Sequence, residues 1–288
     1  MRLRPEPPID IGDLDPGWRS AADIWSNDET LDRLLAAQAA FTVDLDRKAQ
    51  AAYLVIEQSM TMSLAVVVPL LASGVVPDIA PDRIALRFET RRVLHHGRTI
   101  DELKSALRLL SPSYATCDAR WAARPEAVRL PDHAALIDHA RIRFETCFRP
   151  LIRRLHARTG LPSGAMWRLV GDSVSAVFLD AGRRLGCEDE AKRDALAILK
   201  RPGSPLANRQ MHYFDIVIRD PADSDRILAS RSFRSRGGCC RYYTSREGKL
   251  CTTCVLLDPA DRDRNLEAKL RFRLGLAPAS TPTPRHTA

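Results

Sequence analysis

The chain has 288 residues, of which 45% are hydrophobic and 28% charged, so it can bury a substantial core and is not disordered throughout. This length suits one large domain or two small ones. Lysine and arginine number 44 against 36 aspartates and glutamates, a formal charge of +8. That balance favours an anionic partner without choosing among nucleic acid, a membrane surface and a small acidic ligand. The N-terminal residues lack the apolar stretch of a signal peptide, and none is expected.

Helical periodicity dominates most of the chain. Apolar residues recur at helical spacing in eight segments, at about 28–35, 43–68, 99–110, 131–148, 151–158, 163–185, 188–200 and 259–274. Thr99 and Glu102 form a capping box that predicts the start of the third of these helices. Asp258 is placed to cap the last one, with Pro259 as its first residue. Pro150 is expected to break or kink the helical region between the fourth and fifth segments.

Strand signals are few. Apolar and polar side chains alternate at 83–93, and residues 213–218 are typical of a short strand. One or two helical turns are expected at 223–230. The uncharged stretch at 58–77 is long enough to span a bilayer, but it contains several polar residues and two prolines. We therefore expect a buried helix followed by a turn there.

Changes in composition divide the chain into four parts. These are an extended N-terminal segment at 1–17, a helical body with a small β element at 18–205, a cysteine-rich module with a closing helix at 206–276, and a disordered tail at 277–288. The predicted fold class is α+β: a predominantly α-helical body with a small β element and a C-terminal cysteine hairpin module.

Seven cysteines occur, and four of them lie within sixteen residues of one another: Cys239, Cys240, Cys251 and Cys254. An odd number with such clustering is not typical of a secreted disulfide scaffold. It indicates a metal or redox centre in a reducing compartment. Four thiolates are the ligand set of a zinc site or of an iron–sulfur cluster.

The spacing predicts a local structure. Residues 241–250 can form a hairpin that brings the Cys239–Cys240 pair opposite the C-x-x-C turn. Neighbouring side chains on a strand point to opposite faces, so both members of the pair can bind one centre only if the backbone bends. Gly237 and Gly238 permit such a bend. Three alternatives stay open at this point: an iron–sulfur cluster, a Zn(Cys)₄ site, and a vicinal disulfide with a separate pair.

The pattern CC-x10-C-x2-C, with Arg236 before it and Tyr243 and Gly248 within it, resembles the ligand signature of the FhuF-type ferric siderophore reductases. Weaker similarity to that family extends over 74–88 and 160–178. The resemblance implies that the four clustered cysteines hold a [2Fe–2S] cluster, so the C-terminal hairpin would be an iron–sulfur module. It also implies an oxidoreductase that works in the cytoplasm.

Two residues depart from the family pattern. Arg241 follows the cysteine pair where the family has an aliphatic residue, and Val255 follows the last cysteine where proline is common. These departures bear on the tuning of the cluster rather than on its ligation.

The segment from 231 to 249 carries a charge of +5. Its cations favour reduction of an anionic cluster. Two roles are open for these cations. They attract an anionic ferric complex or an acidic electron donor, or they only offset the charge of the cluster. The residues expected to contact substrate or donor are Arg234, Arg236, Arg241, Arg246 and Tyr243. No catalytic residue beyond the cluster is expected, because outer-sphere electron transfer needs no acid or base.

The chain contains neither a G-x-G-x-x-G nor a G-x-x-x-x-G-K-[ST] loop, so the electrons are expected from another protein, such as a ferredoxin or a flavin reductase. The leading hypothesis is a cytoplasmic [2Fe–2S] reductase that converts an Fe³⁺-siderophore to Fe²⁺ and binds no nucleic acid. Peripheral contact with an inner-membrane importer would fit this role. One alternative is a non-enzymatic Zn(Cys)₄ module whose arginine-rich loop binds nucleic acid, and another is an electron carrier without its own chelate site.

Overall fold

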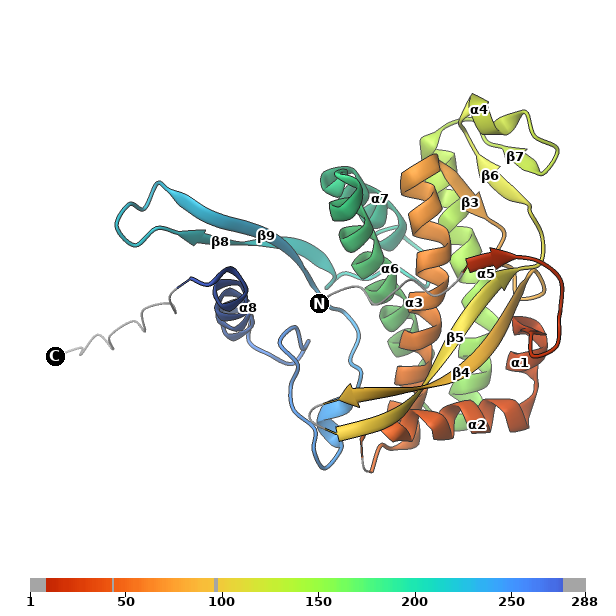
Figure 1. The fold of residues 1–288 in the computed structure, drawn as a ribbon, viewed down its shortest axis with the longest axis horizontal. Helices are drawn as coiled ribbons and strands as arrows, with labels where there is room; N and C mark the ends of the chain where they lie inside the picture. The colour runs from red at the N-terminus through yellow and green to blue at the C-terminus, as the bar shows by residue number, and fades with distance from the viewer. Residues whose placement is uncertain (1–8, 43, 96–97, 277–288) are drawn as a thin grey trace.

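The structure is a computed structural model that describes residues 9–42, 44–95 and 98–276, and its fold class is α+β, as predicted (Figure 1). Four long helices form most of the body: α3 (Arg47–Ser73), α5 (His133–Thr159), α6 (Ser163–Leu185) and α7 (Glu188–Leu199). The shorter helical elements are α1 (Ala21–Ser26), α2 (Asp28–Gln38), η1 (Ala39–Phe41), α4 (Ala119–Ala122) and η2 (Tyr242–Thr244). The last helix, α8 (Pro259–Leu274), lies apart from the others (Figure 1).

The described residues also form three small sheets. One has the order β1-β5-β4-β2 and comprises β1 (Ile9–Ile11), β2 (Arg19–Ser20), β4 (Ile84–His95) and β5 (Arg98–Leu109). The second has the order β3-β6-β7 and comprises β3 (Val75–Pro77), β6 (Tyr114–Thr116) and β7 (Ala127–Arg129). The third is the antiparallel pair of β8 (His212–Arg219) and β9 (Ile227–Ser235).

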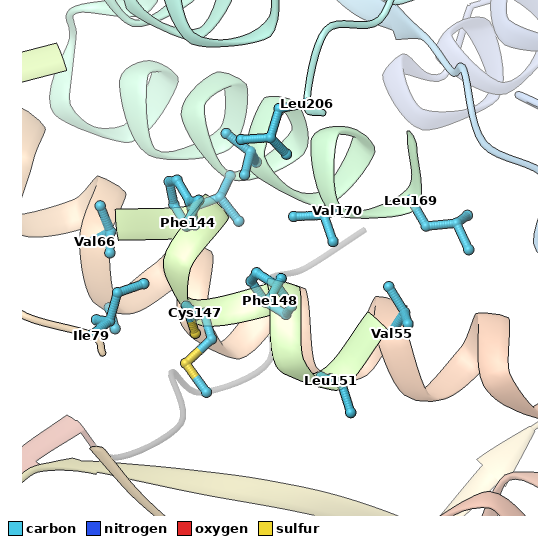
Figure 2. Close-up of a cluster of buried hydrophobic side chains, with 14 of the residues drawn as sticks. Val55, Val66, Ile79, Phe144, Cys147, Phe148, Leu151, Leu169, Val170 and Leu206 are labelled. Carbon is cyan, nitrogen blue, oxygen red and sulfur yellow. The ribbon is translucent and has the colours of Figure 1, made fainter. Parts of the chain in front are cut away.

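The main hydrophobic core lies among α3, α5 and α6, with α5 in the middle of the cluster that Figure 2 shows. Phe144, Phe148 and Leu151 of α5 are fully buried there. Val55 of α3 and Val170 of α6 pack into the same cluster. This core extends from α1 as far as Met211 and gives α3 and α6 fixed positions. These are the two helices against which the cysteine segment lies.

A second, smaller core joins β8, β9 and α8. Ile216 and Ile218 of β8 pack against Leu266 and Leu270 of α8. This unit projects away from the body in Figure 1. It is tied back to α6 by Tyr213, whose hydroxyl donates to the carbonyl oxygen of Ser175 at 2.9 Å. The cysteine segment connects β9 to α8, so both of its ends belong to this unit.

The predicted helix at 99–110 is wrong, because these residues form β5. A capping box is a weak local signal, and here β5 pairs with β4 along twelve consecutive residue pairs, from Ile84 with Leu109 to His95 with Arg98. The backbone hydrogen bonds of that pairing outweigh the local preference for a helix. Residues 223–230 also differ from the prediction, since β9 begins at Ile227.

Of the break or kink predicted at Pro150, the break does not occur: α5 continues through this proline, and α3 likewise continues through Pro69. A proline removes one hydrogen bond inside a helix. Phe148 and Leu151, on either side of Pro150, are fully buried, and their packing keeps the helix continuous. The predicted helices at 163–185, 188–200 and 259–274 are confirmed, as are the strands at 83–93 and 213–218.

Within the described part of the chain, one helix, α3, is long and apolar enough to cross a membrane. Of its apolar window, 61% is buried inside the molecule, so it serves as a core helix, which fits a soluble protein. The predicted buried helix at 58–77 is thus confirmed as far as Ser73, after which Gly74 takes a left-handed conformation and ends it. The predicted tail at 277–288 lies outside the described residues.

Candidate metal centre

The cysteine segment forms an irregular loop between β9 and α8. The hairpin predicted at 241–250 is absent, since residues 236–258 contain no strand and the one short helical element there is η2. Arg241 takes a left-handed conformation, with a φ of 62°, directly after the cysteine pair. This reverses the chain and starts η2. The bend that Gly237 and Gly238 were expected to permit is not seen at the pair, since residues 236–240 form neither turn nor bend and neither glycine is left-handed; the left-handed residue is Arg241.

One side of the loop is held by α6. The backbone N–H of Gly237 donates to Asp172 Oδ1 at 2.9 Å, and that of Gly238 donates to Asp172 Oδ2 at 3.0 Å. At both positions neighbouring atoms of the body lie too close to leave room for a side chain. A Cβ on Gly237 would lie 2.0 Å from the amide nitrogen of Asn208, and one on Gly238 would lie 2.9 Å from the backbone nitrogen of Leu169. The two residues before the cysteine pair are thus pressed against the body.

The other side of the loop is held by the segment that leads into α3. Arg241 Nη2 lies 2.7 Å from Asp46 Oδ2, and Arg246 Nε lies 3.2 Å from Asp44 Oδ2. The hydrogen bond to Arg241 is the main reason that the pKa of Asp46 lies below its usual range. Together with the contacts to α6, these pairs fix the loop between two core helices of the body.

The four clustered cysteines are free thiols, and each is partly buried. Burial raises the pKa of the Cys254 thiol, and the negative charges of Cys251, Cys239 and Cys240 raise it further. The vicinal disulfide considered above is not present. Even so, no three His, Cys, Asp or Glu side chains in the described residues converge into a formed metal site.

Arg236 brings a positive charge to the thiols. Its Nη1 donates to Cys251 Sγ at 3.6 Å, and its Nε donates to Asp172 Oδ2 at 3.3 Å. Burial alone would lower the pKa of Arg236, but Asp172, Cys240 and Cys251 more than offset that effect and hold it above its ordinary value. The backbone N–H of Arg241 also donates to a thiol, Cys239 Sγ, at 3.4 Å.

The residues expected to contact substrate or donor fall into two groups. Arg234 and Arg236 are largely buried and share Asp172, while Arg241 is paired with Asp46. In contrast, the Arg246 side chain is 78% exposed despite its contact with Asp44, and Tyr243 is 44% exposed. Three carboxylates from outside the segment thus offset three of its five net positive charges. Arg246 and Tyr243 are the members of the set that a partner could reach.

Sequence reasoning missed two residues of this region. Asp172 is a carboxylate on an otherwise apolar and small-residue face of α6, and that mismatch was a signal that could have identified it. Tyr53 of α3 lies near the loop: burial raises the pKa of its hydroxyl, and the charge of Cys240 raises it further. No sequence pattern pointed to Tyr53, because it lies on a helix far from the cysteines in sequence.

The donor set fits an anionic iron–sulfur cluster in its chemistry. The four thiols lie on one loop, Cys251 accepts from the largely buried Arg236 guanidinium, and two other buried donors of the described residues, Asn208 Nδ2 and Arg234 Nη1, have no hydrogen-bond partner. Such donors would otherwise be costly to bury, and hydrogen bonds to cluster sulfurs are one way in which proteins tune these groups.

Comparisons of the chain with protein-family models, with curated proteins and with solved structures found no match.

Proposed function

We propose that the protein is a ferric siderophore reductase whose [2Fe–2S] cluster is held by Cys239, Cys240, Cys251 and Cys254. The observation that carries the proposal is the CC-x10-C-x2-C segment, folded as one loop against α3 and α6 with Arg236 donating to Cys251. A bound cluster would supply one electron at a time. The Fe³⁺ of the chelate gains that electron and becomes Fe²⁺, which hard oxygen donors hold less tightly.

The chain's own residues have three tasks in this proposal. The cysteine loop holds the cluster, and Arg236 and Arg241 direct hydrogen bonds at Cys251 and Cys239. A positive charge and N–H donors beside thiolates favour the more negative, reduced state of the centre. Arg246 and Tyr243, which are exposed at the loop surface, are the residues proposed to meet an anionic chelate or an acidic donor protein such as a ferredoxin.

The Zn(Cys)₄ alternative with a nucleic-acid-binding loop has less support, because it needs several arginines free for phosphate contacts. Arg234, Arg236 and Arg241 are instead engaged with carboxylates of the body. The electron-carrier alternative is separated from the reductase by the experiment below.

The test is stopped-flow mixing of the dithionite-reduced protein with a panel of ferric chelates, with Fe²⁺ release followed by a coloured ferrous chelator. The proposal predicts fast reduction of some ferric siderophores and slow reduction of others. Equal rates for every chelate would instead indicate a carrier without its own chelate site. Cys239→Ser should abolish the reaction and the normal cluster, whereas Cys187→Ser, a control outside the loop, should leave both unchanged. A Cys239→Ser variant with wild-type iron content and spectrum would contradict the ligand assignment.

A further inference from the structure

Asp172 is a charged residue in an unusual place. It lies in the middle of α6 and is 3% exposed, although a buried carboxylate is unfavourable unless hydrogen bonds and opposite charges compensate it. Among the described residues, every partner of its carboxylate belongs to the end of β9 or to the loop that leads to the cysteine pair. They are the backbone N–H groups of Gly237 and Gly238, Arg236 Nε, and Arg234 Nη1 at 4.0 Å.

These contacts reach both halves of the cysteine set. Gly237 and Gly238 directly precede the Cys239–Cys240 pair, so Asp172 sets the backbone from which the pair projects. Arg236 bridges from Asp172 to Cys251, the first cysteine of the C-x-x-C turn. One carboxylate on a rigid core helix is therefore linked to two cysteine groups that are ten residues apart in sequence.

The charges at this point also matter. Two arginines, Arg234 and Arg236, share one carboxylate, which leaves one positive charge for the neighbouring thiols. An amide at position 172 would offer one acceptor oxygen and one NH2 donor group to a set of groups that are all donors. It would leave both buried guanidinium groups uncompensated and one glycine N–H without its acceptor.

We propose that Asp172 is a positioning residue for the candidate metal centre: it orders the loop ahead of Cys239 and Cys240 through Gly237 and Gly238, and it orients Arg236 toward Cys251. The part that concerns an iron–sulfur cluster rests on the proposed function. The ordering of the loop does not, because it concerns the chain's own contacts.

The first experiment uses the full chain without metal. The cysteines are pulse-alkylated under native conditions, and the alkylation rate of each one is measured by peptide mass spectrometry. In Asp172→Asn we expect Cys239, Cys240 and Cys251 to react about tenfold faster than in the wild type, the scale of losing one buried hydrogen bond. The matched control is Asp180→Asn on the same helix, because Asp180 is 41% exposed and pairs with Arg183. In this variant the loop cysteines should be alkylated at wild-type rates. Cys147, fully buried in the core, stays protected unless the body unfolds.

A second variant tests the link through Arg236. Arg236→Lys keeps the positive charge but cannot reach Asp172 and Cys251 together with a planar fork. We expect faster alkylation at Cys251, with Cys239 and Cys240 unchanged, because the glycine contacts to Asp172 remain. This variant keeps the proposal testable even if Asp172→Asn fails to fold, which rapid alkylation of Cys147 would reveal.

The same variants, purified without oxygen, are then compared for iron loss to a chelator and for the electron paramagnetic resonance signal after reduction. Asp172→Asn should lose iron faster and show a changed signal. Unchanged alkylation rates at Cys239, Cys240 and Cys251 in Asp172→Asn would overturn the proposal, as would a uniform change at all four loop cysteines in Arg236→Lys. A wild-type protein without iron and sulfide would instead refute the proposed function, and the alkylation rates would still decide the role of Asp172.

Discussion

Gly248 lies where the cysteine loop folds back onto η2. A Cβ at this position would lie 2.1 Å from the carbonyl oxygen of Tyr242 and 2.8 Å from the backbone of Tyr243, which is closer than real contacts allow. Both of those atoms are backbone, so a side chain could be accommodated only by moving the loop. The requirement for glycine is therefore steric, and it concerns the segment between the two cysteine groups.

Gly248→Ala is expected to strain the loop by about 1–3 kcal/mol and to reduce the metal content of the purified protein. The control is Gly164→Ala in the first turn of α6, where a Cβ would meet nothing within 4 Å. That change should be neutral or slightly stabilising, since alanine favours helix more than glycine does. Metal analysis and thermal unfolding of both variants check this. Equal metal content in the two would show that the packing at Gly248 does not matter for the site.

At the scale of elements, the unit of β8, β9 and α8 has a small core of its own and supports both ends of the cysteine loop. Ile218 is fully buried in this core, whereas Val217, the preceding residue on the opposite face of β8, is 40% exposed. The stability of the unit should therefore depend far more on the face of β8 that carries Ile218 than on the face that carries Val217.

Ile218→Ala is expected to destabilise this unit by roughly 2–5 kcal/mol, because it leaves a cavity in a core of few residues. Hydrogen exchange should speed up in β8, β9 and α8 while the amides of α5 keep their protection. Val217→Ala should change exchange little. If Ile218→Ala accelerated exchange equally throughout α5, the unit would not be a separate cooperative element.

The outcomes at this scale show what sequence patterns can and cannot predict. The helices α6, α7 and α8 were predictable because their apolar periodicity and end signals agree with their tertiary surroundings. The segment of β5 was not, because a capping box at Thr99 and Glu102 favoured helix and only the pairing with the preceding strand, β4, reveals the hairpin. For the same reason the continuation of α5 through Pro150 depends on packing that no local pattern displays.

The candidate site was predictable to a similar degree. Spacing alone identified the four cysteines as a group; the structure places them on one loop between β9 and α8, and their role as ligands stays a prediction. The partners of the nearby arginines were not predictable, because Asp172, Asp46 and Asp44 lie far away in sequence and only the fold brings them to the loop. Arginines interpreted as a charged surface are therefore, for the most part, held inside the structure.

At the scale of the whole molecule, a titration in the helical body contributes to the pH dependence of stability. Burial lowers the pKa of His139 on α5 below its ordinary value of 6.5, and Arg143 lowers it further, against smaller opposing effects of Asp78 and Asp138. A histidine with a lowered pKa in the folded state stabilises the fold fully above pH 6.5. That contribution is lost as the pH falls from 6.5 through the lowered value.

His139→Gln should therefore have a flatter dependence of unfolding free energy on pH than the wild type. The wild type is expected to lose more stability than the variant between neutral pH and about pH 5, since it alone must protonate a half-buried imidazole. Urea denaturation of both proteins across this range measures the difference. Parallel curves would mean that His139 titrates alike in the folded and unfolded chains.

The central claim, that the four cysteines of the loop hold a [2Fe–2S] cluster, is tested most directly by purifying the protein without oxygen and measuring its iron, zinc, acid-labile sulfide and visible absorbance. The electron paramagnetic resonance spectrum is recorded after reduction with dithionite. The account predicts about two irons and two sulfides per chain, visible absorption bands and a reduced-state signal. One zinc per chain, with no sulfide and no visible band, would contradict it and favour the Zn(Cys)₄ alternative.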